Sequence, residues 1–476
     1  MTDTMELRYQ ERLDRYVTAL RNKQPDRVPI RPFVAEFAGK YAGYTCQEVT
    51  HDYRKAFDAV CRCALDFDWD AMVGNMVYVW TGLTQAIGLR YYGTPGIDVP
   101  ADTGFQYLEP LQGEEFMRAD EYDALIADPT AFLFDVWLPR VSRDIVPPGA
   151  PSTFRSNLAF LKGGMAMWDY FGGFGAQAGR MRAECGMPGA IAGILKAPLD
   201  ILGDKLRGYV GLSMDLFEQP DKVKAACEAL APHLLSTALA TADPAKDVPI
   251  TIWMHRGCVP FISMDQFKAL YWPTLKPIIE AIWANGHQVL FYAEGDWNAH
   301  LESFAELPEG SIIYHVDKAD IFEAHKVLGN RFCISGGIPN FLLTYGTVDE
   351  VKDRCKKVID EVGADGGFVM DASAIIQNDA KIENMRAMTE FTREYGVYRG
   401  GVSEPAENAE WKKAAAPETP PNVGRSVNRP PGVCIPWEEK KAELPPIQGD
   451  AGIVKRIWEE IDTFGFTFIM HCLVSF

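Results

Sequence analysis

The sequence has no excess of basic residues, no long apolar run and no CxxC pair of cysteines. Its 65 acidic and 47 basic residues give a net charge of −18, which disfavours contact with nucleic acid phosphates or anionic lipids. No segment approaches the roughly 18 apolar residues of a membrane span, and the charged start has no apolar signal core. We therefore expect no export, no membrane and no nucleic acid partner. The ten scattered cysteines favour reduced thiols and a cytoplasmic location.

A nucleotide-binding glycine motif is also missing. The glycine-rich stretch GGMAMWDYFGGFGAQ (163–177) lacks the spacing GxxxxGK[ST] and has no clear strand-to-helix context. We interpret it as a mobile lid that lines an apolar substrate pocket. The candidate lining residues are Met165, Met167, Trp168, Tyr170, Phe171 and Phe174. The alternative is that these aromatic residues belong to the core.

Strands and helices alternate regularly in the second half of the chain. Apolar runs of strand length are separated by helical patterns, and four complete strand-helix-strand steps follow one another. The strand segments are VPITIWMH (248–255), QVLFYAE (288–294), SIIYHV (311–316), RFCISGGI (331–338) and GGFVMDAS (366–373). We predict an α/β fold, a (β/α)₈ TIM barrel, with an open doubly wound sheet as the alternative.

The flanking segments complete this plan. An amphipathic N-terminal helix (5–22) precedes a first strand at VPIRPFV (28–34), DWDAMVGNM (68–76) is a second strand candidate, and residues 91–150 resemble an insertion. We divide the chain into a barrel over 1–398 and a Pro-rich C-terminal extension with a terminal helix over 399–476. The extension is either a strap on the barrel or on a second subunit, or an arm that recruits a partner. Its apolar end predicts burial, and a homodimer interface is one place for it.

Side chains at the carboxyl ends of barrel strands form the active site in this fold class. His255, Glu294 and His315 end three successive strands, and two imidazoles with one carboxylate are a ligand set of catalytic zinc. Cys333 is a further candidate ligand, although a cysteine inside a strand is more often a core residue. Hydrogen bonding or general acid–base catalysis by the same His and Glu residues is the alternative to metal binding.

Further site residues are predicted with less specific roles. Asp371 ends the last strand and is a candidate general acid, a partner for a histidine or an acceptor for substrate, and His255 is the second catalytic candidate. Glu36, Trp168 and Tyr292 are candidate substrate-binding residues. We interpret the five histidines at positions 51, 233, 287, 300 and 325 as surface or core residues.

Four segments resemble the uroporphyrinogen decarboxylase superfamily, which includes the corrinoid-dependent methyltransferases. They are ALRNKQPDRVPI (19–30), SMDLFEQPDKVKA (213–225), EAHKVLGNRFCISGGIPNFLLTYGTVDEV (323–351) and GGFVMDASAIIQNDAKIENMRAM (366–388). The resemblance covers roughly residues 15 to 398, and it implies a (β/α)₈ barrel with the active site at its carboxyl face.

The decarboxylases and the thiol-methylating members carry motifs that this sequence lacks. AEFAGKY (35–41) places Glu36 and Lys40 where the decarboxylases have arginines, and VGNMVYV (73–79) has no aspartate where they have an essential one. Residues 292–295 and 373–374 lack the zinc ligands of the thiol-methylating enzymes. The resemblance therefore argues against porphyrinogen decarboxylation.

FYAEG followed by SIIYH is similar to the zinc motif of O-demethylase methyltransferase components. The resemblance implies Glu294 and His315 as ligands, with Glu280 an imperfect match for another and His255 our own proposal for the third. It implies a methyltransferase that demethylates a small methoxylated, aromatic methyl donor. Zinc would activate the ether oxygen, and the methyl group would pass to the cobalamin of a separate corrinoid protein.

Two other functions stay open at this stage. One is a decarboxylase or lyase of a small acid, whose carboxylate Lys40, Lys162 or Arg256 would hold. The other is a non-catalytic binding protein, which would be favoured if His255, Glu294 and His315 lay far apart or were buried in unrelated hydrogen bonds.

Overall fold

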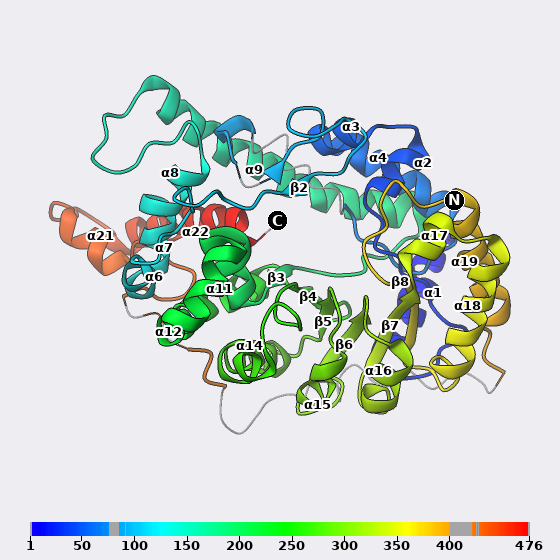
Figure 1. The fold of residues 1–476 in the computed structure, drawn as a ribbon. Helices are drawn as coiled ribbons and strands as arrows, with labels where there is room; N and C mark the ends of the chain where they lie inside the picture. The colour runs from blue at the N-terminus through cyan, green and yellow to red at the C-terminus, as the bar shows by residue number, and fades with distance from the viewer. Residues whose placement is uncertain are drawn as a thin grey trace.

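The computed structural model describes residues 2–75, 85–90, 92–399, 421–424, 426 and 428–474. Its centre is a sheet of six parallel strands in the order β3-β4-β5-β6-β7-β8 (Figure 1). The strands are β3 (Ile194–Lys196), β4 (Ile250–Met254), β5 (Val289–Ala293), β6 (Ile312–Val316), β7 (Cys333–Ile338) and β8 (Phe368–Ala372). Nearly every residue of these strands is buried, as expected of a parallel sheet that helices cover on its outside.

Two further extended segments close the sheet into a barrel. Ile30 pairs in parallel with Met370 of β8, and the amide of Asp70 donates a 2.8 Å hydrogen bond to the carbonyl of Ile30. Met72 in turn pairs with Gly189, just before β3. Six strands and these two segments give eight strand positions, so the predicted (β/α)₈ barrel is confirmed and the open sheet is excluded. Residue 76, the end of the predicted second strand, lies outside the described residues.

Helices surround the barrel in the expected alternation. Each packs an apolar face on the strands, as in α18, where Val351, Cys355, Val358 and Ile359 are buried at helical spacing. The outer layer consists of α1 (Thr2–Leu20), α12 (Pro220–Ala240), α14 (Trp272–Ala284), α15 (Leu301–Phe304), α16 (Ile321–Leu328), α18 (Val348–Glu361) and α19 (Ile382–Tyr395).

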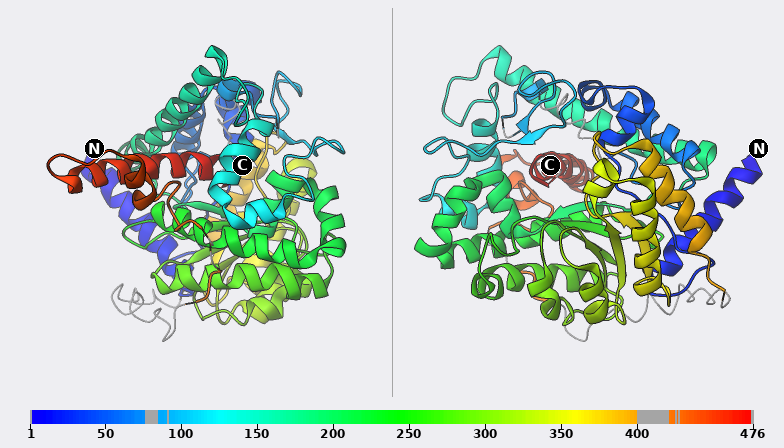
Figure 2. Two further views of the ribbon diagram at one scale, coloured as in Figure 1. Left: turned by 90° about the vertical axis from the view of Figure 1, so that its left-hand side faces the viewer. Right: turned by 45° about the vertical axis from the view of Figure 1, so that its right-hand side comes forward.

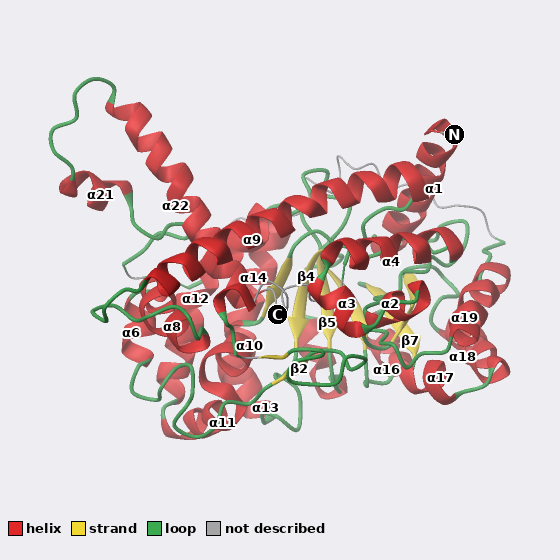
Figure 3. Ribbon diagram, turned by 90° about the horizontal axis from the view of Figure 1, so that it is seen from above, coloured by secondary structure: helices red, strands yellow, loops and turns green. Residues whose placement is uncertain are grey.

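Shorter elements and one long helix gather at the carboxyl end of the barrel (Figure 3). They include α2 (Glu36–Ala42), α3 (Cys46–His51), α4 (Tyr53–Asp66), α6 (Tyr122–Ala127), α7 (Pro129–Phe132), α8 (Leu138–Val141), α10 (Pro198–Ile201), α11 (Gly208–Glu218), α13 (Met264–Gln266), α17 (Asn340–Tyr345) and the hairpin of β1 (Tyr92–Gly93) with β2 (Gln106–Tyr107). Residues 91–150 are thus an insertion with some strand content, as predicted, although residue 91 itself lies outside the described part.

The long helix is α9 (Phe154–Arg180), which contains the whole glycine-rich stretch. A capping box between Thr153 and Ser156 starts it, and Gly163, Met167 and Tyr170 are buried at helical spacing. The glycine-rich stretch is therefore regular helix, because the periodicity of these apolar residues outweighs the low helix propensity of the glycines.

The C-terminal extension ends in α21 (Trp437–Glu443) and α22 (Ala451–Val474). The first half of α22 projects away from the barrel with Ile453, Ile457 and Ile461 about half exposed, whereas Phe466 and residues 468–474 are buried. Figure 2 shows α22 running from the periphery to the C-terminus at the centre of the molecule. The prediction of a buried apolar end is confirmed. Residues 400–420 of the Pro-rich stretch lie outside the described residues, and none of the described helices could cross a bilayer.

Candidate active site

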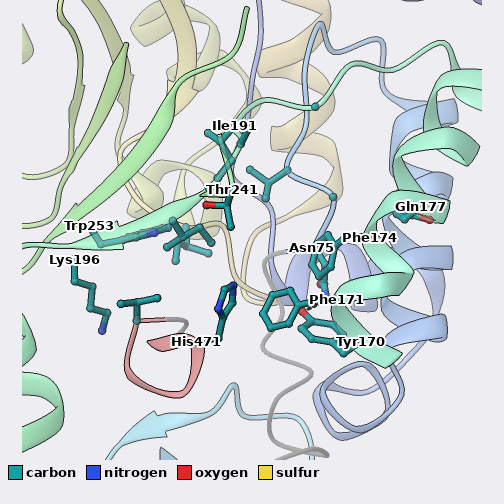
Figure 4. Close-up of a pocket in the computed structure, with 18 of the residues that line it drawn as sticks. Asn75, Tyr170, Phe171, Phe174, Gln177, Ile191, Lys196, Thr241, Trp253 and His471 are labelled. Carbon is teal, nitrogen blue, oxygen red and sulfur yellow. Dashed lines mark hydrogen bonds between the residues drawn. The ribbon is translucent and has the colours of Figure 1, made fainter. Parts of the chain in front are cut away.

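A cavity of about 840 Å³, partly open to solvent, lies at the carboxyl end of the barrel strands. Most of its wall is apolar, since Tyr170, Phe171 and Phe174 of α9 face Trp253 of β4. Charged side chains come from the ends of three neighbouring strands and the segments that follow them: Lys196, Asp204, His255, Arg256 and Glu294. Figure 4 shows Lys196 and Trp253 on one side of the cavity and the α9 aromatics on the other. The site therefore combines an aromatic pocket with one charged corner.

Lys196 and Asp204 form the first charged pair of that corner. Lys196 is the last residue of β3, and its ammonium donates to the carboxylate of Asp204, which lies eight residues later in a π-helical turn, Leu202–Arg207. Tyr209 donates to the other oxygen of the same carboxylate. Burial opposes ionisation of Asp204, but Lys196 and His255 outweigh it and hold the pKa of Asp204 well below its usual range. The corner therefore keeps a buried, neutralised ion pair facing the cavity.

His255 and Glu294 form the second pair. Strand register places them side by side, because Met254 of β4 pairs with Ala293 of β5, and His255 and Glu294 directly follow these two residues. His255 Nδ1 donates to Glu294 at 2.8 Å, while its Nε2 has no hydrogen-bond partner within the described part of the chain and lies 3.8 Å from Asp204. Burial disfavours the imidazolium, but Glu294 and Asp204 outweigh it and raise the pKa of His255. The same pairing lowers the pKa of Glu294 against the effect of burial.

Asp200 holds the backbone at the end of β4 in place. Its carboxylate accepts the amides of His255 and Arg256 at 3.0 and 2.9 Å and the hydroxyl of Tyr271 at 2.9 Å. The guanidinium of Arg256 lies 4.2 Å from the ring centres of both Tyr209 and Phe261. His255 and Arg256, which both line the cavity, are thus positioned by bonds to the main chain and by stacking.

His315 does not join His255 and Glu294. Register pairs His315 with Tyr292, two residues before Glu294, so it lies about 6.6 Å deeper in the barrel at the usual rise of a strand. There Nε2 donates to the carbonyl of Ser373 at 3.1 Å, and Nδ1 lies 3.3 Å from Arg31 and 3.0 Å from the hydroxyl of Ser335. Burial, with Arg31, holds the pKa of His315 well below its usual range. Both ring nitrogens are therefore used within the barrel.

Asp371 belongs to the same buried layer as His315. It forms an ion pair with Arg31 at 3.0 Å, both side chains are fully buried, and neither lines the cavity. Burial raises the pKa of Asp371 to about 7 against the opposing effect of Arg31. The structure therefore does not support Asp371 as a general acid that contacts substrate. It supports Asp371 as a partner of other buried groups.

The remaining candidates lie outside the cavity as well. Cys333 is buried at the start of β7, and Tyr292 is buried between Trp253 and His315, at 4.0 and 4.5 Å between ring centres. Glu36 is buried at the start of α2, where burial raises its pKa to about 7. Trp168 is 66% exposed and contacts Phe464 on the outer side of α9. The aromatic lining of the pocket thus comes from the neighbours of Trp168.

The predicted zinc ligands do not fit a zinc ion in this arrangement. Both ring nitrogens of His315 are hydrogen-bonded within the barrel. Cys333 lies at the start of its strand, away from the carboxyl end, and Glu280 belongs to α14 in the outer layer. No group of three His, Cys, Asp or Glu side chains in the described ranges has the geometry of a metal site. In the corner itself the ammonium of Lys196 already supplies the positive charge. We therefore derive no chemistry from zinc.

Sequence reasoning missed Lys196, Asp204 and His471. Lys196 ends a strand of only three residues, and the alternation of strands and helices was legible only after residue 208. The signal that could have revealed it is a lone lysine at the end of the apolar run AIAGIL, before Pro198 at the start of a helix. Nothing in the local sequence of α22 indicates that His471 reaches the cavity.

Comparisons with known proteins found a matching family model and similar solved structures. Residues 177–395 match the model of the family described as Uroporphyrinogen decarboxylase (URO-D), so the predicted resemblance is confirmed for this part of the chain, which contains the charged corner. A methyltransferase from Methanosarcina mazei is a similar solved structure, with 17% sequence identity, a TM-score of 0.49 and coverage of 80% of this chain and 98% of that chain. No curated protein sequence matches significantly.

Proposed function

Because residues 177–395 match the URO-D family, we propose that this chain is an enzyme of that superfamily and, more narrowly, a methyltransferase. Its substrate is a methoxylated aromatic compound, and its methyl acceptor is the cobalamin of a separate corrinoid protein. The observation that carries the proposal is the combination of aromatic walls with a proton-donating corner in one cavity at the barrel mouth. The cavity is partly open to solvent, which an acceptor carried by another protein requires.

In this proposal, acid–base groups of the chain stabilise the departing ether oxygen, the role that the sequence analysis gave to zinc. When the bond between the methyl carbon and the ether oxygen breaks, its electron pair stays on the oxygen. The imidazolium of His255 donates a proton to that oxygen, and Glu294 stabilises the positive charge of the imidazolium before transfer. A corrinoid, when bound, would supply the electron pair of the new bond to the methyl carbon. The products are a neutral phenol and a methylated acceptor, and the ammonium of Lys196 stabilises negative charge on the departing oxygen.

Replacing Glu294 by glutamine tests whether the pair of His255 and Glu294 takes part in the reaction. We expect Glu294→Gln to lower kcat by about 10²- to 10⁴-fold, because the imidazolium loses the carboxylate that stabilises it. Transfer of methyl from 2-methoxyphenol to free cob(I)alamin would be followed by the spectrum of methylcobalamin. Glu280→Gln is the matched control, since Glu280 lies in the outer layer. Loss of activity in the control, or full activity in Glu294→Gln, would contradict the proposal.

The same pair predicts a bell-shaped dependence of kcat/KM on pH. Turnover needs the imidazolium, so it falls as pH rises through the raised pKa of His255, and it falls as pH drops through the lowered pKa of Glu294. In Glu294→Gln the pKa of His255 loses its main upward influence, so the basic limb moves to lower pH. The check is a profile from about pH 4 to 10 for both proteins. A basic limb at the same pH in both would show that another group donates the proton.

A decarboxylase or lyase of a small carboxylic acid is the second candidate. The specific observation in its favour is that cationic side chains, Lys196 and Arg256 together with Arg182, line the cavity and suit a carboxylate. Lys40 and Lys162 do not line it: Lys40 donates to the carbonyl of Asn378, and Lys162 is exposed on α9. Release of carbon dioxide from an aromatic acid without any methyl acceptor would replace the methyltransferase proposal by this one.

A further inference from the structure

The C-terminal helix α22 contributes a wall of the cavity. His471 and Val474 line it together with Lys196 and Trp253, although more than two hundred residues separate the two pairs in sequence. Around His471, the side chains of Ile469, Met470, Cys472 and Leu473 are almost fully buried, so the last turns of α22 are anchored by packing. The family match ends at residue 395, before this helix. This wall is therefore a feature of the extension and lies outside the family match.

His471 is held in one tautomer and one orientation. Its Nδ1 donates to the carbonyl of Thr467, one turn earlier, at 2.8 Å. In a neutral imidazole this bond leaves the other nitrogen, Nε2, as a hydrogen-bond acceptor. Burial lowers the pKa of His471, so the ring is neutral near pH 7. Phe171 packs edge-on against the ring at 4.4 Å between centres, which fixes the plane of the imidazole.

The oriented acceptor lies within the apolar part of the cavity. Figure 4 shows His471 between the side of the cavity that holds Lys196 and Trp253 and the side formed by Phe171 and Tyr170. Nε2 has no hydrogen-bond partner among the described residues. A ligand that fills this space without a donor group would cover Nε2 and remove it from water, at a cost of about 1 to 3 kcal/mol for an unsatisfied polar group. A ligand with a hydroxyl at that position would satisfy it.

We propose that His471 is a specificity residue whose Nε2 accepts a hydrogen bond from a hydroxyl group of the aromatic ligand. The inference deepens the proposed function, on which it rests, by naming the substrate class: a phenolic methyl ether, with the hydroxyl at His471 and the ether oxygen at His255. The terminal helix thereby selects among aromatic compounds that the apolar walls alone would accept equally.

A binding experiment with simple probes tests this selection. Dissociation constants of phenol and toluene, which differ in the hydroxyl, would be measured by calorimetry on the full chain and on His471→Phe and His471→Gln. We expect the ratio of the toluene to the phenol constant to fall about tenfold in His471→Phe, the effect of losing one hydrogen bond to a group that becomes buried. His471→Gln should keep most of the preference, because its amide oxygen accepts. His325→Phe, in the outer layer on α16, is the matched control.

The outcomes separate this inference from the proposed function. An unchanged ratio in His471→Phe would overturn the role of His471, and so would a wild-type protein that binds neither probe. If His471→Phe does not fold, His471→Gln still tests the role, because glutamine keeps a hydrogen-bond acceptor at this position. Methyl transfer plays no part in the measurement. A protein that transfers no methyl group but keeps the expected ratios would refute the proposed function and leave the role of His471 standing.

Discussion

Replacing Lys196 by methionine is expected to reduce methyl transfer by about 10²- to 10³-fold, which is the usual effect of removing one preorganised electrostatic group from an active site. The ammonium is the cation of the charged corner, and only 5% of its side chain is exposed. Methionine has a similar length and fills the same space without charge. The measurement is the rate of methylcobalamin formation from 2-methoxyphenol.

The variant also leaves Asp204 without its main partner. A buried carboxylate that loses its counter-charge costs about 3 to 5 kcal/mol of stability, although Tyr209 still donates to it. The double variant Lys196→Met/Asp204→Asn removes the stranded charge and should recover most of the free energy of unfolding. It should not recover activity. Turnover within about tenfold of the wild type in either variant would show that Lys196 has no part in the chemistry.

The second large effect is expected on stability, at Arg31. Its guanidinium is fully buried, pairs with Asp371 and donates to Ser335. Arg31→Met should lower the free energy of unfolding by about 3 to 5 kcal/mol, because an acidic group and hydroxyl lose their donor inside the barrel. Arg31→Met/Asp371→Leu removes both partners and should lose less than the single variant. Urea denaturation of the three proteins provides the comparison, and equal losses in both variants would contradict it.

The loss in Arg31→Met should depend on pH. Burial already raises the pKa of Asp371 to about 7 in the folded protein, above its ordinary value in the unfolded chain. A carboxyl whose folded pKa is raised binds a proton more strongly when folded, so its contribution to stability falls as pH rises from the unfolded towards the folded pKa. Without Arg31 the folded pKa rises further. The loss of stability should therefore be larger near pH 8 than near pH 5, while a constant difference would show that Asp371 stays neutral throughout.

The sequence singled out His255 and Glu294, which the structure places together in the charged corner. His255 and Glu294 end neighbouring strands at the same level, and the structure brings them together at 2.8 Å. Strand β6 starts and ends level with β5, but His315 is its penultimate residue and pairs with Tyr292, two residues before the level of Glu294. The apolar pattern indicates roughly where a strand ends, whereas the exact residue that reaches the level of a neighbouring strand end depends on the register of the barrel. This difference of two residues separates His315 from the pair formed by His255 and Glu294.

The chain by itself determined the alternation of strands and helices, the barrel that follows from it, and the burial of its apolar end. These features depend on local hydrophobic periodicity, which can be recognised in each segment of the sequence by itself. Only the tertiary structure decided that Lys196 meets Asp204 beside His255, that His315 is sealed in a deeper layer, and that His471 of the last helix enters the same cavity. Contacts between residues distant in sequence depend on strand register and on where a terminal helix docks, and no local pattern records either.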